Sequence, residues 1–282
     1  GDSQARGFLI GATVGRTTLN GEGLQHQDGH SHVLSSTIPN CISYDPAYSY
    51  ELAVIIKDGI RRMYQDMESV FYYITTMNEN YQQPEMPKGV EKDIINGMYL
   101  LEDGNSKEFK VGKPINKEHR VRLLGSGTIL REARKAAELL RTEYSVAVDV
   151  WSVTSFNELR REALEIGREN MLNSDKKPKV PFVTDKLSKQ AGPVISATDY
   201  MKIHSDQVRE FIPDTYRVLG TDGFGRSDSR EQLRHFFEVD MKFIAAAALY
   251  ELKEAGLIDG KILATHYKSL GIDKNKANPI YQ

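Results

Sequence analysis

The sequence has a single cysteine, no long apolar run and no secretory signal pattern. One cysteine, Cys41, excludes a disulfide within the chain and is typical of a reducing compartment, and its place in an expected strand favours a buried, inert thiol. The longest strongly apolar run, Phe243–Tyr250, is far shorter than the roughly 20 residues of a membrane span. The start lacks the basic, apolar and small-residue segments of a signal peptide. We therefore expect a cytoplasmic protein.

An excess of positive charge is also absent. The 282 residues contain 37 Lys and Arg against 39 Asp and Glu, which gives a net charge of −2. Nucleic acid and anionic lipid are attracted by a basic surface, so this balance predicts no nucleic-acid or membrane partner and favours small molecules or proteins. With 40% hydrophobic and 27% charged residues, the composition is that of a globular protein.

Strands and helices alternate along most of the chain, as judged from apolar periodicity and turn residues. The expected strands cover residues 7–14, 69–79, 120–127, 145–156, 179–185, 192–200 and 216–223. One or two further short strands are expected within residues 33–45. The expected helices cover residues 47–66, 90–101, 129–144, 156–172, 205–213, 240–255 and 259–270. Asp45 and Thr128 are the predicted caps of the helices that follow them. This alternation predicts an α/β fold with two doubly wound, mostly parallel sheets.

The expected elements divide the chain into two units. Residues 80–89 are polar and contain two prolines and a glycine, which is typical of a linker. The polar stretch at residues 102–119 is expected to be an exposed excursion. We therefore predict a first unit over residues 1–86, a linker with a short helix over 87–119 and a second unit over 120–282. The chain starts directly in a strand, so the first unit is expected to be part of a larger domain.

Residues 15–32, GRTTLNGEGLQHQDGHSH, combine glycines with several titratable side chains. His26, Asp28, His30 and His32 fall within seven residues and are possible metal ligands, although no second cysteine or helical pair of histidines accompanies them. An acid/base loop is the second interpretation, because imidazole titrates near neutrality and Glu22 precedes His26 by four residues. A solvated surface loop is the third. The residues alone leave all three open.

Two further glycine-containing segments follow expected strands. Residues 123–133 read strand, Gly-Ser-Gly and helix, an arrangement that can hold a phosphate, but the full dinucleotide pattern is missing and a tight turn is favoured. Residues 220–240 place Asp222, Arg226 and Asp228 after a strand, where open α/β sheets bind ligands. A capping role for Asp228 with the glutamate three residues later is an equal alternative.

Six stretches together resemble one known family: ARGFLIGATVGRTTLNGEGLQHQDGHSH, TIPNCISYDPAYSYELAVI, FYYITTMNENY, LLGSGTILREA, WSVTSFNELRRE and YRVLGTDGFGRSDSREQLRHFFEVD. The sequence is similar to the homodimeric bacterial type of pyruvate dehydrogenase decarboxylating subunit, a thiamine diphosphate enzyme related to transketolase. The resemblance implies the later part of a middle, pyrimidine-binding domain followed by a transketolase-like C-terminal domain.

The resemblance also implies site residues. The family's GEGLQH segment reaches the active site, and Glu22 and His26 match its acid and its histidine. His26 is expected to donate a proton to, or stabilise charge on, the substrate oxygen or the enamine intermediate, with Glu22 orienting it. Gln27 stands where the family usually has glutamate. Further residues are expected near substrate or cofactor: Asp28, His30, Asp222 and Arg226.

The function implied by the resemblance is decarboxylation of pyruvate on thiamine diphosphate with Mg²⁺, followed by transfer of the acetyl unit to the lipoyl group of dihydrolipoyl acetyltransferase. The family's Gly-Asp-Gly metal pattern with its later asparagine is absent, and its cofactor-activating glutamate belongs further upstream. We therefore expect this chain alone to be inactive and to bind no cofactor tightly. The alternatives are another transketolase-like enzyme, such as a transketolase or a 2-oxoglutarate-specific relative, and a non-catalytic dimerisation or docking module.

Overall fold

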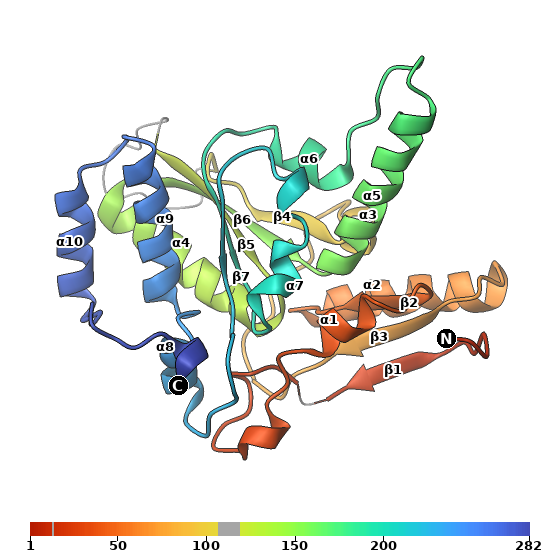
Figure 1. Ribbon diagram of the computed structural model, residues 1–282, viewed down its shortest axis with the longest axis horizontal. Helices are drawn as coiled ribbons and strands as arrows, with labels where there is room; N and C mark the ends of the chain where they lie inside the picture. Colours follow the sequence, from red (N-terminus) through yellow and green to blue (C-terminus); the bar gives the residue numbers. More distant parts are fainter. Residues whose placement is uncertain (13, 107–118) are drawn as a thin grey trace.

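The computed structural model describes residues 1–12, 14–106 and 119–282 and contains two β-sheets with helices packed against them (Figure 1). The first sheet has three parallel strands in the order β1-β3-β2. The second has five strands in the order β4-β6-β5-β7-β8, of which only β4 runs antiparallel to its neighbour. The strands are β1 Phe8–Gly11, β2 Cys41–Tyr44, β3 Phe71–Thr75, β4 Met98–Glu102, β5 Arg120–Gly125, β6 Ala147–Val153, β7 Val194–Ala197 and β8 Tyr216–Leu219.

The helices cover both faces of the second sheet, which confirms the doubly wound α/β class. The α-helices are α1 Ser31–Ser35, α2 Ser49–Ile60, α3 Glu91–Asn96, α4 Leu130–Tyr144, α5 Phe156–Leu172, α6 Phe182–Leu187, α7 Lys202–Asp206, α8 Arg230–Phe236, α9 Met241–Glu254 and α10 Gly260–Ser269. Short 3₁₀ turns occur at Leu24–His26, Gly127–Ile129, Arg209–Phe211 and Pro279–Tyr281, and a π turn at Arg61–Gln65 extends α2. None of the helices in these described ranges is long and apolar enough to cross a membrane.

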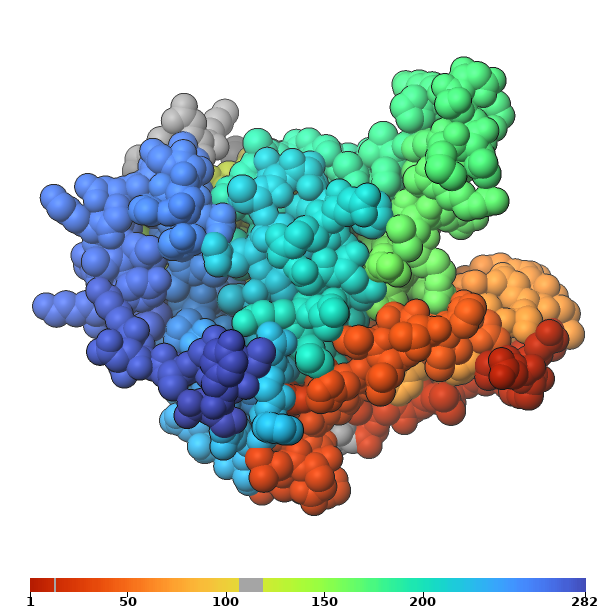
Figure 2. Space-filling view, viewed as in Figure 1, coloured from red at the N-terminus to blue at the C-terminus, as the bar shows by residue number. Residues whose placement is uncertain are grey.

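Alternating residues of the second sheet fill two different cores. In β5, Leu123 packs with α4 and α9 on one face, whereas Leu124 packs with α5 and α6 on the other. In β6, Val150 and Trp151 are divided in the same way. Successive strand residues point to opposite faces, so a strand buried on both sides has an almost continuous apolar sequence. Figure 2 shows that α5 and the segment after it project from the body of the molecule.

Three expectations about single elements are wrong. Residues 179–185, expected to be a strand, contain the start of α6, because Val183 and Leu187 are both buried one helical turn apart. The helix expected over 90–101 ends at Gly97, whose φ of 109° breaks it, and β4 follows. The helix expected over 205–213 is replaced by α7 and the 3₁₀ turn at Arg209–Phe211.

The expected caps also differ from the observed ones. The helix expected from residue 47 begins at Ser49, and Glu51 reaches back to accept hydrogen bonds from the Ala47 and Tyr48 N–H groups at 2.6 and 3.0 Å. Asp45 therefore caps nothing and is free for a buried role. The Thr128 hydroxyl donates to Glu79 at 2.8 Å instead of capping α4.

The proposed division at residues 86 and 119 stays a prediction. β4 lies inside the expected linker, yet it pairs with β6 and is part of the second sheet. Most of the polar excursion expected at 102–119 lies outside the described residues. The two sheets are joined by a buried contact, in which Glu51 of α2 accepts hydrogen bonds from the Tyr99 and Ser152 hydroxyls at 2.7 and 2.6 Å. A carboxylate at this position thus connects an element of the first sheet to two strands of the second.

Replacing Glu51 by alanine is expected to lower the thermal unfolding midpoint clearly. The change leaves the Tyr99 and Ser152 hydroxyls and two N–H groups without their acceptor in the interior, at a cost of about 1–3 kcal/mol for each group that stays unsatisfied. Circular dichroism melting measures the midpoint, and Glu165→Ala on the exposed side of α5 is the matched control. Equal midpoints for both variants would contradict the role of Glu51 as the joint.

Candidate functional site

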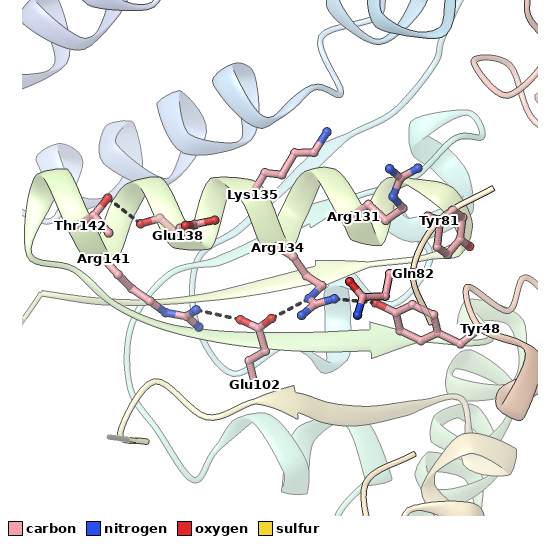
Figure 3. Close-up of a pocket in the computed structure, with 10 residues that line it drawn as sticks. All are labelled: Tyr48, Tyr81, Gln82, Glu102, Arg131, Arg134, Lys135, Glu138, Arg141 and Thr142. Carbon is pink, nitrogen blue, oxygen red and sulfur yellow. Dashed lines mark hydrogen bonds and ion pairs between the residues drawn. The ribbon is translucent and has the colours of Figure 1, made fainter. Parts of the chain in front are cut away.

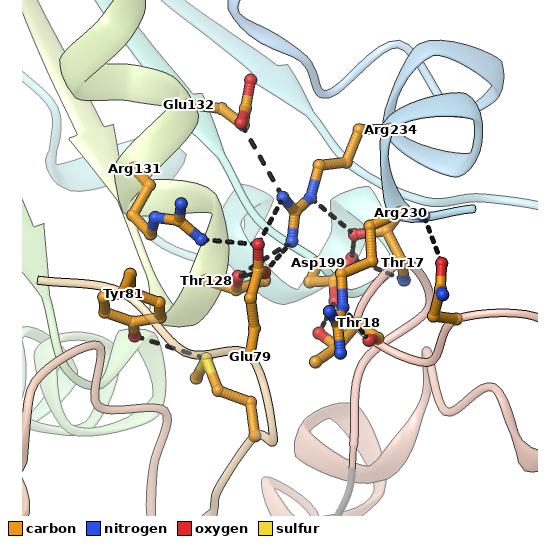
Figure 4. A network of polar contacts seen from close by, with 12 residues as sticks. Thr17, Thr18, Glu79, Tyr81, Thr128, Arg131, Glu132, Asp199, Arg230 and Arg234 are labelled. Atoms are coloured by element: carbon orange, nitrogen blue, oxygen red, sulfur yellow. Dashed lines mark hydrogen bonds and ion pairs between the residues drawn. The ribbon is translucent and has the colours of Figure 1, made fainter.

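The glycine- and histidine-rich loop is anchored at the carboxyl end of β7. Asp199 follows this strand, and its carboxylate accepts hydrogen bonds from the Thr17 N–H at 3.0 Å, the Thr17 hydroxyl at 2.7 Å and the Thr18 hydroxyl at 2.8 Å (Figure 4). Gly15 has a φ of 98°, and a β-carbon there would overlap the Asp199 carboxylate. The loop can therefore approach β7 this closely only with glycine at position 15.

A second carboxylate, Glu79, joins the first sheet to α4 and α8 at the same place (Figure 4). Arg234 of α8 forms an ion pair with it, and Arg131 of α4 donates to its Oε1 at 2.5 Å. Burial opposes the charge of Glu79, but the hydrogen bond and charge of Arg234, together with Thr128 and Arg131, lower its pKa to about 2. Arg234 also reaches the Thr17 hydroxyl at 3.4 Å. The anchor of the loop is thus braced by an ionised pair.

Glu22 and His26 lie at the exposed tip of this loop. Both side chains are exposed, and neither makes a hydrogen bond or ion pair with another residue of the described ranges. The Gly21 N–H donates to the Asp228 carbonyl at 2.9 Å, which ties the start of the tip to the residue before α8. The two side chains expected to do chemistry are therefore presented outward on a fixed backbone.

The segment after β8, which contains Gly225 and Arg226, packs against the loop tip and supports it. Gln27 is buried, and its Oε1 accepts a hydrogen bond from the Arg226 N–H at 2.6 Å. A β-carbon at Gly225 would lie 2.7 Å from the Leu24 carbonyl oxygen, so this backbone packs directly on the 3₁₀ turn that contains His26. The Gln27 amide accepts this bond without adding a charge beneath the tip.

The remaining predicted residues hold the backbone of the site. Asp28 lies just before α1 and accepts hydrogen bonds from the His30 N–H at 2.9 Å and the Ser31 N–H at 3.0 Å. Asp222 accepts a hydrogen bond from the Lys202 N–H at 2.9 Å, at the start of α7. The guanidinium of Arg226 lies 5.0 Å from the centre of the Phe236 ring. Asp222 therefore contacts a different element from the one that carries His26, whereas Arg226 contacts the loop itself.

Of the two alternatives left open for Asp228, the capping of α8 is wrong. Ser229 is the N-cap of α8, and its hydroxyl accepts a hydrogen bond from the Gln232 N–H at 3.3 Å. The Asp228 side chain instead accepts a hydrogen bond from the Ser229 N–H at 2.7 Å, and its backbone carbonyl accepts one from the Gly21 N–H of the loop tip. Its backbone thus positions the loop, while its side chain is exposed.

A buried arginine, which the sequence analysis did not single out, connects both segments. The Arg16 side chain donates to the carbonyl groups of Thr221 and Gly223, and its Nη2 lies 3.4 Å from the His30 Nδ1. Burial lowers the pKa of Arg16, while the charges of Asp28, Asp199 and Asp222 raise it. In the sequence, only the position of Arg16 within the loop, directly before Thr17, could have indicated its role.

A buried chain of polar groups lies behind the loop and was also missed. The His32 Nε2 lies 2.9 Å from the Thr75 hydroxyl, which donates to Asp45 Oδ1 at 2.8 Å. The His32 ring stacks on His204 with 4.9 Å between centroids, and burial lowers the pKa of His32 to about 3. His32 is therefore a neutral, inward group, unlike the exposed His30.

The four possible metal ligands of the histidine-rich loop are not gathered at one place. In the part of the chain that the structure describes, no group of three or more His, Cys, Asp or Glu side chains is arranged to hold a metal ion. His26 and His30 are exposed and His32 is buried, so the four possible ligands of the loop face different surroundings. The thiol of Cys41 is buried, and burial raises its pKa to about 11, in keeping with an inert side chain.

Two protein-family models match the chain. The pyruvate dehydrogenase E1 component middle domain matches residues 1–84, and the transketolase-like TK C-terminal domain matches residues 97–240, more than half of the chain. The second match contains the whole second sheet and the carboxyl ends of its strands. The chain therefore belongs to the transketolase-like family, and its first 84 residues match the middle domain of the pyruvate dehydrogenase E1 component.

Curated relatives agree with this assignment. The pyruvate dehydrogenase E1 component of Pseudomonas aeruginosa is 57% identical over 281 residues, which are 99% of this chain and 31% of that protein. The E1 component of Escherichia coli is 55% identical over the same share of this chain and 30% of its own length. The chain thus spans about a third of the length of the relatives it matches. The transketolase of Campylobacter jejuni shares the fold, with a TM-score of 0.57, 17% identity, and coverage of 86% of this chain and 31% of that one.

The Asp45→Asn variant is expected to change how stability depends on pH. Burial raises the pKa of Asp45 to about 7 from 3.8, against the opposing hydrogen bond from Thr75. Between these two values the folded chain holds a proton that the unfolded chain has released, so the wild type loses stability as pH rises, by up to about 1.4 kcal/mol per pH unit. Asparagine cannot ionise, so the variant gains stability relative to the wild type from pH 4 to pH 7.

Urea unfolding at several pH values measures this difference. The Asp185→Asn variant, whose carboxylate is 59% exposed, is the matched control and should follow the wild type at every pH. Parallel stability curves for Asp45→Asn and the wild type would show that the Asp45 carboxyl titrates normally.

Proposed function

We propose that the chain forms the substrate-facing loop and the C-terminal domain of a pyruvate dehydrogenase E1 component. In such an enzyme, pyruvate is decarboxylated on thiamine diphosphate, and the acetyl unit passes to the lipoyl group of dihydrolipoyl acetyltransferase. The observation that carries this proposal is the match over 99% of this chain, at 57% and 55% identity, to two E1 components. A homodimeric enzyme in the cytoplasm is part of the same proposal.

His26 is the proposed proton donor. Its imidazole is exposed and makes no hydrogen bond or ion pair with other described residues, so both ring nitrogens are available to a bound 2-oxo acid. A proton given to the carbonyl oxygen of pyruvate, or a hydrogen bond to it, stabilises the negative charge that develops there. Glu22, four residues earlier on the same tip, is proposed to orient the imidazole. We therefore propose His26 and Glu22 as the catalytic residues of this loop.

The other four predicted residues are proposed to act indirectly, by positioning the loop. Asp28 fixes the start of α1, and the backbone N–H of Arg226 holds the Gln27 side chain beneath the tip. His30 and Asp222 have partners in Arg16 and Lys202. We propose that these four position the loop near substrate and cofactor.

The described residues of this chain do not fit the Mg²⁺ ion and the diphosphate group of thiamine diphosphate. No suitable cluster of metal ligands occurs among the described residues, and the family's Gly-Asp-Gly pattern is absent from the sequence. We propose that the cofactor and Mg²⁺ are bound by the part of a longer E1 component that this chain does not match. The exposed Leu9 and Ile10 on edge strand β1 support this, since such apolar side chains usually pack against further structure.

A docking or dimerisation module is the second candidate. The exposed Leu164, Met171 and Leu172 on the projecting part of α5 favour a contact surface there. Helix α9, in contrast, buries Ile244, Ala248 and Leu252 in the core and has little apolar surface left for a partner. Another transketolase-like enzyme remains the alternative for the substrate, and decarboxylation of 2-oxoglutarate in place of pyruvate would favour it.

In a full-length enzyme that contains this chain, His26→Ala is expected to lower the rate of pyruvate decarboxylation by about 10²–10⁴-fold, the usual contribution of a general acid. Glu22→Ala should lower it in the same direction by a smaller factor. The release of carbon dioxide measures the rate, with Gln25→Ala, on the same exposed turn, as the control. Unchanged turnover in the double variant His26→Ala/Glu22→Ala would contradict the proposal.

The isolated chain is expected to bind magnesium thiamine diphosphate weakly and to leave pyruvate unchanged, because the metal and diphosphate ligands are missing from the described site. Isothermal titration of the 282-residue chain with the cofactor, followed by an assay for carbon dioxide, tests both points. Micromolar binding together with decarboxylation would show that the chain is a complete catalytic unit.

A further inference from the structure

A pocket of about 440 Å³ is formed by the loop tip, α8 and the segment that joins β8 to α8. Leu24 of the 3₁₀ turn, with Leu233 and Phe236 of α8, gives it apolar walls. Arg226 and Asp228 are its ionisable side chains. Neither of the two proposed catalytic residues lines this pocket, so it is a separate site beside them.

The guanidinium of Arg226 has no hydrogen-bond or ion-pair partner in the part of the chain that the structure describes. Its Nε is enclosed by protein and makes no hydrogen bond, and the same is true of the neighbouring Gln27 Nε2. The Asp228 carboxylate accepts a hydrogen bond from the Ser229 N–H instead of pairing with this arginine. Enclosed donors are almost always paired in native structures, so two unpaired donors side by side indicate a place where an external acceptor binds.

The arginines of the larger pocket beside α4 differ in this respect (Figure 3). There Glu102 accepts hydrogen bonds from Arg134 and Arg141 at 2.6 and 2.7 Å. Those guanidinium groups already have a carboxylate partner within the chain. The guanidinium after β8 is therefore the better candidate for binding an external anion.

The Arg226 side chain is also held in a defined position. Its guanidinium carbon lies 5.0 Å from the centre of the Phe236 ring, within the range of a cation–π contact. Its backbone N–H donates to the Gln27 Oε1 at 2.6 Å. Because the ring and the backbone both restrict this side chain, an anion would lose less binding energy to ordering it.

We infer that this pocket binds a small monocarboxylate with an apolar tail, whose carboxylate pairs with the Arg226 guanidinium. A guanidinium presents two parallel N–H donors that match the two oxygens of a carboxylate. The side chains of Leu24, Leu233 and Phe236 favour an apolar tail over a polar one. The Asp228 carboxylate repels a second negative charge, so dicarboxylates and phosphates suit the pocket less well.

A ligand in this pocket contacts the turn that carries the proposed catalytic imidazole. Leu24 is 53% exposed and begins the 3₁₀ turn that ends at His26. The N–H groups of His26 and Gln27 donate to the carbonyl groups of Gly23 and Leu24 at 3.0 and 3.3 Å. Covering Leu24 with an apolar tail stabilises this turn against local opening. Binding itself does not depend on the function proposed above.

Isothermal titration of the 282-residue chain with hexanoate, hexanamide, adipate and acetate tests the site. Hexanoate is expected to bind at one site per chain with a dissociation constant of about 1 mM or less. Hexanamide lacks the charge, adipate carries a second one and acetate lacks the tail. Each should therefore bind at least about fivefold more weakly than hexanoate.

Variants of the two charged residues separate their roles. Arg226→Gln removes the guanidinium but keeps the backbone N–H that holds Gln27, so it should weaken hexanoate at least about tenfold. Circular dichroism melting checks that this variant is folded. Asp228→Asn should bring the affinity for adipate closer to that for hexanoate. Arg168→Gln, on the exposed side of α5, is the matched control and should bind as the wild type does.

Hydrogen exchange locates the bound acid. Hexanoate should slow exchange at the N–H groups of His26 and Gln27 in the wild type, and less in Arg226→Gln at the same concentration. The inference is overturned by hexanamide or adipate binding as tightly as hexanoate, by an affinity that Arg226→Gln leaves unchanged, or by no binding of hexanoate in the millimolar range.

Discussion

The arrangement of the site depends on the buried carboxylate of Asp199. It accepts three hydrogen bonds from two consecutive threonines, so the first residues of the loop have one position relative to β7. Burial raises the pKa of Asp199 to about 6, while the bonds from Thr17 and Thr18 and the charge of Arg234 oppose this shift. A buried acceptor is costly unless donors surround it, which makes this contact specific as well as stabilising.

Two carboxylates with several donors each connect the two sheets. Glu51 and Glu79 each connect an element of the first sheet to elements of the second, and each has several donors. Burying such charges gains little net stability, because desolvation offsets much of the attraction. Their geometric demands are strict, however. The loop that presents Glu22 and His26 outward is therefore attached to a contact between the sheets that has one well-defined arrangement.

The local signals of the sequence were sufficient for the long helices and the central strands. Ser155 and Asp240 cap α5 and α9, and the two-sided cores give β5 and β6 continuous apolar sequences. β4 was missed because its partner, β6, lies some fifty residues further along the chain. Within the loop, spacing identified the histidines but not their directions. That His32 turns inward and His26 outward follows from the start of α1 at Ser31, which only the folded chain reveals.

The backbone at residues 223–225 is enclosed on both sides. A β-carbon at Gly223 would lie 2.8 Å from the Pro279 carbonyl oxygen, and Gly225 packs as closely on Leu24. The last residues of the chain therefore rest on the support of the loop tip, whereas Gly1 lies at the far end of the first sheet (Figure 1). A displacement of the segment around Pro279 would therefore be transmitted through Gly223 and Gly225 to the turn that carries the imidazole.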